Sequence, residues 1–313
     1  MTEIEEYVSS IIANVEKVIV GKRSIIELLM VALLCEGHVL LEDVPGTGKT
    51  MLARSLAVSL KGQFKRLQCT PDLLPNDVTG VAVFNQKSAE FEFHPGPIFV
   101  NILLVDEINR ATPRTQSALL ESMQEQQATV EGVTYSLPRP FLVLATQNPI
   151  EYEGTFPLPE AQLDRFLMKL SVGYPSTEDE KLLLNRLSHE HPINGLEPVV
   201  ESEKLIQFQR QVWDIYVEDS LQDYIIQLIN STRSHRDLVL GASPRASLAL
   251  FKAAQALAAI RGRDHVIPED IKYLAIPTLA HRLMVRPESE LRGKNAKAIV
   301  KEIVDSTPID LGK

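Results

Sequence analysis

The chain has 313 residues, of which 44% are hydrophobic and 23% are charged, and this length and composition predict a well-packed protein of two domains. The formal net charge of -9 disfavours a surface built mainly to bind nucleic-acid phosphates or an anionic membrane. Two cysteines, Cys35 and Cys69, lie far apart without a CxxC pattern, so neither a disulfide framework nor a zinc site is expected.

The beginning of the chain gives an expectation about its compartment. Its first residues, MTEIEE, are acidic where a signal peptide would be basic. The longest apolar run, from Ile25 to Cys35, contains Glu27 and is too short to span a membrane. We therefore expect a cytoplasmic protein without membrane insertion.

The first half of the chain alternates short apolar runs with helical patterns. Helices are predicted over Thr50–Leu60 and Thr112–Gln126, the second with Thr112 as N-cap and Pro113 at its first position. The apolar runs are typical of buried parallel strands. They are Val39–Leu41, Phe64–Gln68, Ile102–Val105, Phe141–Leu144 and Leu167–Leu170. This alternation predicts an α/β sandwich around a largely parallel five-stranded sheet.

Two further segments and the second half of the chain have other patterns. Val81–Phe93 and Thr129–Leu137 alternate apolar and polar residues around turn-like centres, so both are predicted to be inserted β-hairpins. After Tyr174 and Pro175 the strand patterns give way to amphipathic helical ones. These helices are predicted over Glu178–Glu190, Ser202–Tyr216, Ser220–Arg233, Pro244–Ile260 and Pro268–Leu283. We expect an α/β core over residues 1–174 and an all-α domain over residues 175–313.

A glycine-rich loop, LEDVPGTGKT from Leu41 to Thr50, follows the first predicted strand and opens a helix. Backbone N–H groups in such a loop can bind phosphate oxygens. Lys49 would reach the β- and γ-phosphates of ATP, and the Thr50 hydroxyl would ligate Mg²⁺. The general motif GxxxxGK[ST] has glycine where this chain has Asp43, but Gly46 and Gly48 still permit a close approach of the backbone.

The predicted strand Ile102–Val105 is followed directly by Asp106 and Glu107. At the carboxyl end of a parallel strand both side chains can face the phosphate edge of the sheet. Asp106 would hold the Mg²⁺ shell, and Glu107 would polarise the attacking water as general base. Solvated carboxylates are common at strand ends, so the pair alone would be weak evidence for catalysis. The phosphate-binding loop earlier in the chain is what favours a catalytic role for Asp106 and Glu107.

Three more polar residues are candidates for the same chemistry. Asn148, after the strand Phe141–Leu144, would contact the γ-phosphate or orient water, or else cap its loop. Arg165 is either a salt-bridge partner of Asp164 or Glu160, or an arginine finger acting on a neighbouring subunit. Arg245 begins a predicted helix after Ser243 and Pro244, and it is either solvated or reaches across an interdomain cleft.

Together, in this order, these segments resemble the AAA+ ATPases, and specifically the MoxR family. The resemblance covers the chain from Val20 to about Glu288, and Asp is ordinary in that family at the position of Asp43. Its most specific stretches are LEDVPGTGKT at 41–50, DEINRA at 106–111, QSALLESMQE at 116–125, ATQNP at 145–149 and PEAQLDRF at 159–166.

The resemblance implies a role for each candidate residue. Pro45, Gly46, Thr47, Gly48, Lys49 and Thr50 would form the Walker A loop, and Asp106 and Glu107 the Walker B pair. Asn148 matches the sensor 1 residue, Arg165 the arginine finger and Arg245 the sensor 2 arginine. Val20 and Gly21 match the segment beside adenine. The two hairpins resemble the helix-2 insert and the pre-sensor-1 insertion of the clade that includes magnesium chelatase and the MCM helicases.

The implied function is that of a magnesium-dependent ATPase with ATP and Mg²⁺ bound between an AAA+ core and a helical lid. The resemblance to MoxR proteins implies a homo-oligomeric, hexameric ring that acts on a protein client, either like a chaperone or by inserting a metal cofactor. It also implies a partner with a von Willebrand factor A domain. A magnesium-chelatase-like motor, a DNA-acting motor and a non-enzymatic nucleotide switch are alternatives. Another ring or a spiral is an alternative to the hexamer.

Overall fold

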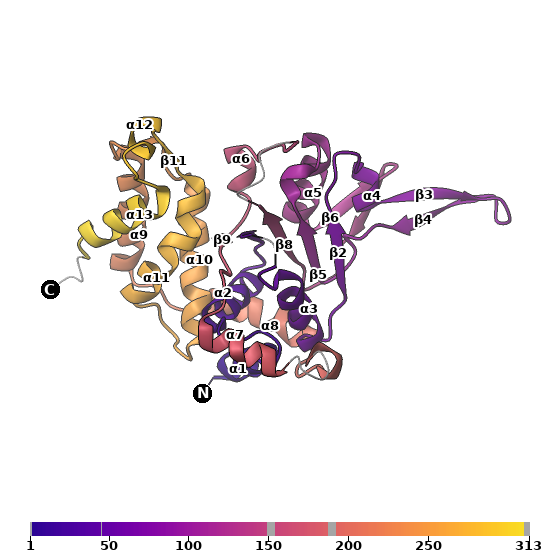
Figure 1. Ribbon diagram of the computed structural model, residues 1–313, viewed down its shortest axis with the longest axis horizontal. Helices are drawn as coiled ribbons and strands as arrows, with labels where there is room; N and C mark the ends of the chain where they lie inside the picture. Colours follow the sequence, from indigo (N-terminus) through magenta and orange to yellow (C-terminus); the bar gives the residue numbers. More distant parts are fainter. Residues whose placement is uncertain (1, 45, 149–153, 187–191, 310–313) are drawn as a thin grey trace.

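The computed structural model describes residues 2–44, 46–148, 154–186 and 192–309. Its core is a five-stranded parallel sheet in the order β2-β5-β8-β1-β9 (Figure 1). The strands are β1 (Val39–Glu42), β2 (Phe64–Gln68), β5 (Ile102–Asp106), β8 (Leu142–Gln147) and β9 (Met168–Leu170). All five predicted strands are therefore confirmed, and their carboxyl ends share one edge of the sheet.

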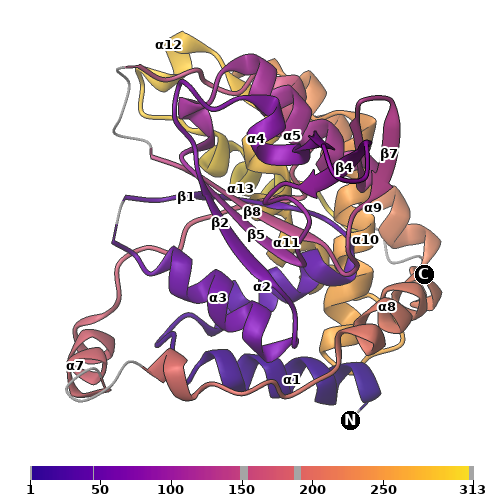
Figure 2. The ribbon, with the colours of Figure 1, turned by 90° about the vertical axis from the view of Figure 1, so that its right-hand side faces the viewer.

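Helices cover both faces of this sheet because its central strands are apolar on both sides. Alternate residues enter two separate hydrophobic clusters: Leu104 and Leu144 belong to one, and Leu103 and Val143 to the other. Figure 2 shows the two layers, with α1 to α3 on one face and α4 and α5 on the other. These helices are α1 (Glu3–Val15), α2 (Arg23–Leu34), α3 (Lys49–Ser59), α4 (Pro75–Thr79) and α5 (Pro113–Glu125). The Thr112 side chain caps α5 by accepting from the Thr115 amide, as predicted.

Both predicted hairpins are confirmed. One consists of β3 (Gly80–Asn85) and β4 (Glu90–Pro95), and the other of β6 (Gln127–Val130) and β7 (Val133–Ser136). The β3–β4 hairpin extends away from the core on the side opposite the C-terminal helices (Figure 1). It carries Phe84 and Phe91, which are 50% and 72% exposed and pack edge to face with each other.

The C-terminal half is mainly helical, as predicted. Its longer helices are α7 (Thr177–Arg186), α8 (Ser202–Gln211), α9 (Asp219–Ser234), α10 (Pro244–Ile260), α11 (Pro268–Leu279) and α13 (Ala296–Ser306), with short turns α6 (Glu160–Leu163) and α12 (Pro287–Glu290). The last residues predicted for the first of these helices, 187–190, lie outside the described residues. None of the helices within the described ranges is long and apolar enough to cross a membrane.

Two features of this region were not predicted. β10 (Leu238–Leu240) pairs antiparallel with β11 (Met284–Val285), and strands of three and two residues carry no readable alternation. The helices α1 and α2 also pack against α10, and α2 packs against α8. One hydrophobic cluster consequently runs without a break from the sheet into the C-terminal helices.

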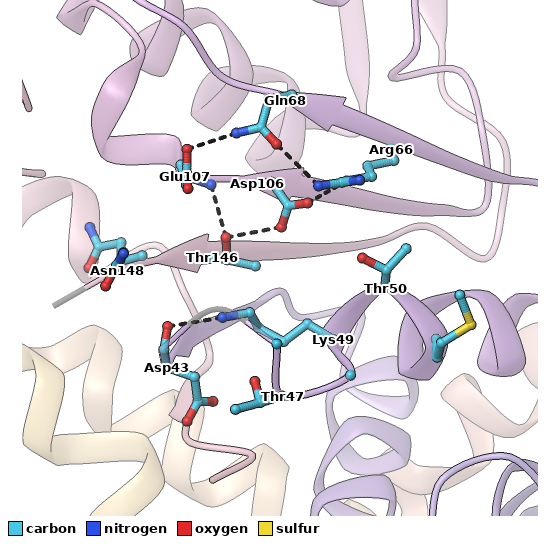
Figure 3. Close-up of a pocket in the computed structure, with 14 residues that line it drawn as sticks. Asp43, Thr47, Lys49, Thr50, Arg66, Gln68, Asp106, Glu107, Thr146 and Asn148 are labelled. Carbon is cyan, nitrogen blue, oxygen red and sulfur yellow. Dashed lines mark hydrogen bonds and ion pairs between the residues drawn. The ribbon is translucent and has the colours of Figure 1, made fainter. Parts of the chain in front are cut away.

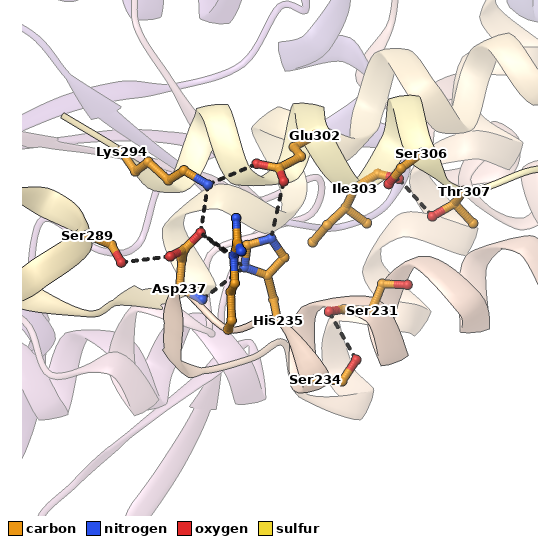
Figure 4. A network of polar contacts seen from close by, with 11 residues as sticks. Ser231, Ser234, His235, Asp237, Ser289, Lys294, Glu302, Ile303, Ser306 and Thr307 are labelled. Carbon is orange, nitrogen blue, oxygen red and sulfur yellow. Dashed lines mark hydrogen bonds and ion pairs between the residues drawn. The ribbon is translucent and has the colours of Figure 1, made fainter. Parts of the chain in front are cut away.

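A polar network fastens the end of the chain to this small sheet (Figure 4). Asp237, just before β10, accepts hydrogen bonds from Ser289 Oγ at 2.9 Å and Lys294 Nζ at 2.7 Å. Lys294 also pairs with Glu302 of α13. The hydrogen bonds from Lys294 and Ser289 lower the pKa of Asp237 to about 2. The network thus connects the loop between α9 and β10 to α12 and α13.

Candidate nucleotide site

A pocket of about 350 Å³ opens at the carboxyl edge of the sheet. The loop after β1, the end of β5 and the end of β8 meet there, because parallel strands all end at the same edge. Figure 3 shows Lys49 and Thr50 on one side of the pocket and Asp106 and Glu107 on the other. Asn148, which follows β8, also lines it. The structure therefore brings together five of the residues predicted from separate motifs.

The glycine-rich loop has the conformation that its sequence requires. Gly46 and Gly48 have φ values of 86° and 83°, in the left-handed region that favours glycine. Gly48 is the N-cap of α3, so the positive end of that helix faces the pocket. Lys49 Nζ donates to the carbonyls of Asp43 and Val44 at 3.0 and 3.2 Å. Pro45, which was predicted to bind nucleotide, lies outside the described residues.

Asp106 is buried at the pocket wall, and each of its carboxylate oxygens has a partner. Thr146 Oγ1 donates to Asp106 Oδ1 at 3.1 Å, and Arg66 Nε donates to Asp106 Oδ2. Arg66 and Thr146 were both missed by sequence reasoning. Arg66 lies on β2, and only the pairing of β2 with β5 brings it beside the carboxylate.

Glu107 is held in an uncommon backbone conformation, with φ of 56°. Its N–H donates to Thr146 Oγ1 at 2.9 Å, so one threonine hydroxyl contacts both members of the acidic pair. Its carboxylate accepts from Gln68 Nε2 at 2.8 Å and Arg110 Nη1 at 3.1 Å. Gln68 is another residue that the motifs did not identify, since it lies opposite Asp106 on the neighbouring strand.

A second, more apolar pocket of about 200 Å³ lies beside the glycine-rich loop. Val20, Met51 and Pro175 line it together with Gly46 to Gly48. Val20 thus lies next to the loop, and its place beside adenine stays a prediction. Gly21 adjoins it with φ of 69°, and a side chain there would overlap the Asp179 carboxylate.

Arg165 and Arg245 lie elsewhere. They line a different groove, between the core and α10, together with Lys252 and Arg282. Arg165 Nη1 donates to the Leu120 carbonyl at 3.3 Å, and Arg245 Nη1 is 3.8 Å from Asp164 Oδ2. The Asp164 ion pair considered for Arg165 is formed instead by Arg282, at 2.6 Å, and by Arg245. The two arginines share one face of the molecule, apart from the pocket that holds Lys49.

The chain matches two family models, and these cover the core and the lid. Residues 38–168 match the ATPase family associated with various cellular activities (AAA), and residues 230–303 match the AAA lid domain. The fold is similar to a solved structure from Cytophaga hutchinsonii that is described as a candidate ATPase. The TM-score is 0.92 at 39% identity, over 98% of this chain and 96% of the other.

Two curated relatives extend along most of the chain. The uncharacterized protein YeaC of Bacillus subtilis is 55% identical over 298 residues, which are 95% of this chain and 93% of YeaC. Chaperone MoxR1 of Mycobacterium tuberculosis is 44% identical over 283 residues, which are 88% of this chain and 74% of MoxR1. Nucleotide binding follows from the shared AAA fold. The chain belongs to the MoxR family of AAA+ ATPases.

Proposed function

We propose that the chain is a magnesium-dependent ATPase that hydrolyses ATP at the subunit interfaces of a ring and uses the energy to remodel a protein client. The observation that supports this most directly is the pocket in which Lys49, Thr50, Asp106, Glu107 and Asn148 converge. Five residue types that phosphoryl transfer requires meet there from three different segments of the chain.

The donors of the pocket fit the groups that the proposal needs. The Thr50 hydroxyl and the Asp106 carboxylate are hard oxygen ligands of the kind that Mg²⁺ prefers, and the metal would neutralise charge on the phosphates. The open space around Gly46 and Gly48 leaves their backbone accessible to phosphate oxygens. Lys49 would exchange its two carbonyl partners for phosphate oxygens when nucleotide binds.

The acidic pair and Asn148 have separate tasks in this proposal. Glu107 would accept a proton from the attacking water, and Asn148 would orient that water through its amide. The Thr146 hydroxyl, which contacts both Asp106 and Glu107, would keep the two carboxylates at a fixed separation. The chain's contribution is thus positioning and electrostatic stabilisation, which dominate phosphoryl transfer.

The positions of Arg165 and Arg245 support a site shared between subunits. Both lie on a face apart from the pocket, so each would serve the nucleotide of the neighbouring subunit in a head-to-tail ring. This revises the expectation that Arg245 acts across the cleft of its own chain. A ring of this kind, hexameric in our proposal, is catalytically complete only when assembled.

The client-directed part of the proposal rests on kinship with chaperone MoxR1 and on the exposed β3–β4 hairpin. Phe84 and Phe91 give this hairpin an apolar surface that a protein client could contact. A partner with a von Willebrand factor A domain and a metal-inserting outcome remain proposals by analogy with the family.

The proposal is tested with a Glu107→Gln variant and a matched Glu269→Gln control, whose residue is exposed on α11. Phosphate release at saturating Mg-ATP should fall by about 10²–10⁴-fold in Glu107→Gln, while ATP affinity stays near that of the wild type. The ATP-loaded variant should sediment as a ring and co-purify with client protein. Wild-type protein without measurable phosphate release would favour a nucleotide switch, and strong stimulation by DNA would favour a DNA motor.

A further inference from the structure

Asp43 is the residue at which this chain departs from the general phosphate-loop motif, and the residue is 6% exposed. Figure 3 shows its carbonyl facing Lys49 while its carboxylate points away from the acidic pair. The carboxylate is therefore not directed at the proposed phosphate positions. Its role must come from what it contacts on the other side of the loop.

The Asp43 carboxylate receives hydrogen bonds from a single short segment. Ser171 Oγ donates to Oδ1 at 2.8 Å, the Gly173 N–H donates to Oδ1 at 3.0 Å, and the Val172 N–H donates to Oδ2 at 2.6 Å. Every partner is a donor, which is the environment of an ionised carboxylate. A buried carboxylate needs such compensation, because an unpaired one would be strongly disfavoured.

The main-chain groups of Asp43 make contacts on the phosphate side of the site. Its carbonyl accepts from Lys49 Nζ at 3.0 Å, and its N–H donates to the Gln147 carbonyl at the end of β8 at 3.4 Å. One residue thus connects the lysine of the loop, the strand that leads to Asn148 and the segment 171–173.

Segment 171–175 forms part of the apolar pocket beside the loop. It follows β9 directly and leads to α7, and Gly173 and Pro175 line the pocket that Val20 also lines. Lys22 Nζ donates to the Tyr174 carbonyl at 2.8 Å, which ties the segment to the other wall of the pocket. Asp43 therefore connects the phosphate loop to a segment that lines the apolar pocket.

We propose that Asp43 is a positioning residue that fixes the apolar, base-side wall of the nucleotide site to the phosphate loop, so that the adenosine and triphosphate moieties are bound as one unit. The inference rests on the proposed function. It adds that the Asp43 contacts matter for the affinity for ATP and not for the affinity for an inorganic triphosphate. Loss of the Asp43 contacts frees the wall at 171–175 but leaves the glycines and Lys49 in place. Affinity for ATP falls, whereas affinity for an inorganic triphosphate is kept.

Asp43→Asn and Ser171→Ala test the contact from its two ends. The first replaces an acceptor with an amide that faces donors, and the second removes one donor without altering the loop. Ser117→Ala is the matched control, because its hydroxyl is exposed and bonds only to the Pro113 carbonyl of its own helix. Thermal unfolding of each variant establishes that it is folded, and Ser171→Ala keeps the test decisive if Asp43→Asn does not fold.

The measurement is calorimetric affinity for ATP and for inorganic tripolyphosphate, each with Mg²⁺. Asp43→Asn should weaken ATP binding about tenfold, and Ser171→Ala several-fold, with tripolyphosphate affinity unchanged in both. Equal losses for both ligands, or no loss for either, would overturn the role of Asp43. Wild-type protein that fails to bind ATP would instead overturn the proposed function, so the two failures are distinguishable.

Discussion

Gln68 Nε2 donates a hydrogen bond of 2.8 Å to Glu107 Oε2, which joins the end of the edge strand β2 to the proposed general base. The same oxygen accepts from Arg110 Nη1 at 3.1 Å. A carboxylate oxygen held by two donors is less available to accept a proton from water. Since β2 continues through residues 69–79 into the β3–β4 hairpin, this contact also links the exposed hairpin to the acidic pair.

Replacement of Gln68 should release Glu107 from one of these two restraints. We expect Gln68→Ala to raise basal ATP turnover about two- to fivefold without a change in ATP affinity, because one hydrogen bond to the Glu107 carboxylate is lost and the phosphate loop is untouched. Steady-state phosphate release measures the effect. Gln207→Ala, at an exposed position of α8, is the control. A drop in turnover would mean that Gln68 holds Glu107 in its productive position instead.

A site shared between subunits predicts complementation between two inactive variants. Lys49→Ala should abolish binding at its own pocket, and Arg165→Ala should reduce turnover by about 10³–10⁵-fold. In rings mixed in equal amounts, about a quarter of the interfaces combine an intact loop with an intact finger, so about a quarter of wild-type turnover should return.

This experiment requires mixed rings whose composition is verified, for example by two different affinity tags. Arg165 and Arg245 lie in the same groove, so an Arg245→Ala variant should be rescued by Lys49→Ala subunits in the same way. Rescue of neither arginine variant in verified mixed rings would contradict action between subunits.

Much of the fold was predictable because local patterns agree with it. The five apolar runs became the five parallel strands, and α10 begins and ends at the predicted residues Pro244 and Ile260. The phosphate loop and the Asp106–Glu107 pair could be placed together because the carboxyl ends of parallel strands meet at one edge. Their individual roles stay predictions.

The remaining parts of the site depend on tertiary structure. Arg66, Gln68 and Thr146 reach the acidic pair only through the strand order β2-β5-β8, which no local pattern specifies. The partners of Asp43 lie about 130 residues further along the chain, and no spacing rule connects them. The position of Arg245 beside Arg165 depends on how α10 packs against the core, which its helical pattern does not indicate.

Two buried histidines predict how stability depends on pH. His38 Nε2 lies 2.9 Å from the Met123 carbonyl, and the Val143 N–H donates to His38 Nδ1 at 3.1 Å, so the ring is neutral. Burial lowers the pKa of His38 to about 4 and that of His281 to about 3. Below the unfolded pKa of about 6.5 the unfolded chain binds more protons than the folded one, so stability falls as pH falls.

The free energy of unfolding should decrease by about 1.4 kcal/mol per pH unit for each histidine between about pH 6 and pH 4.5. His38→Gln removes one titrating group, so chemical denaturation of this variant should have a slope with pH that is smaller by about that amount. His94→Gln, at an exposed position of β4, should keep the wild-type slope. If the free energy of unfolding of His38→Gln had the same slope with pH as that of the wild type, the pKa of His38 would be the same in the folded and unfolded states.

Arg282 lies between the C-terminal helices and the core, and its side chain is 2% exposed. It donates to Asp164 Oδ1 at 2.6 Å and to the Phe166 carbonyl at 2.7 Å, and burial lowers its pKa. Arg282→Met removes the 2.6 Å ion pair of Asp164 and one hydrogen bond to the Phe166 carbonyl, while Ser243 and His281 still contact these two acceptors. The free energy of unfolding should fall by about 3 kcal/mol. Chemical denaturation measures this, with the exposed Arg292→Met as control. Adding Asp164→Asn should cost less in the Arg282→Met background than in the wild type, because Asp164 has then already lost its 2.6 Å ion pair. Asp164 directly precedes Arg165, the proposed arginine finger. In rings that contain Lys49→Ala subunits, a lower turnover of the same double variant would mean that the position of the finger depends on the contact between lid and core.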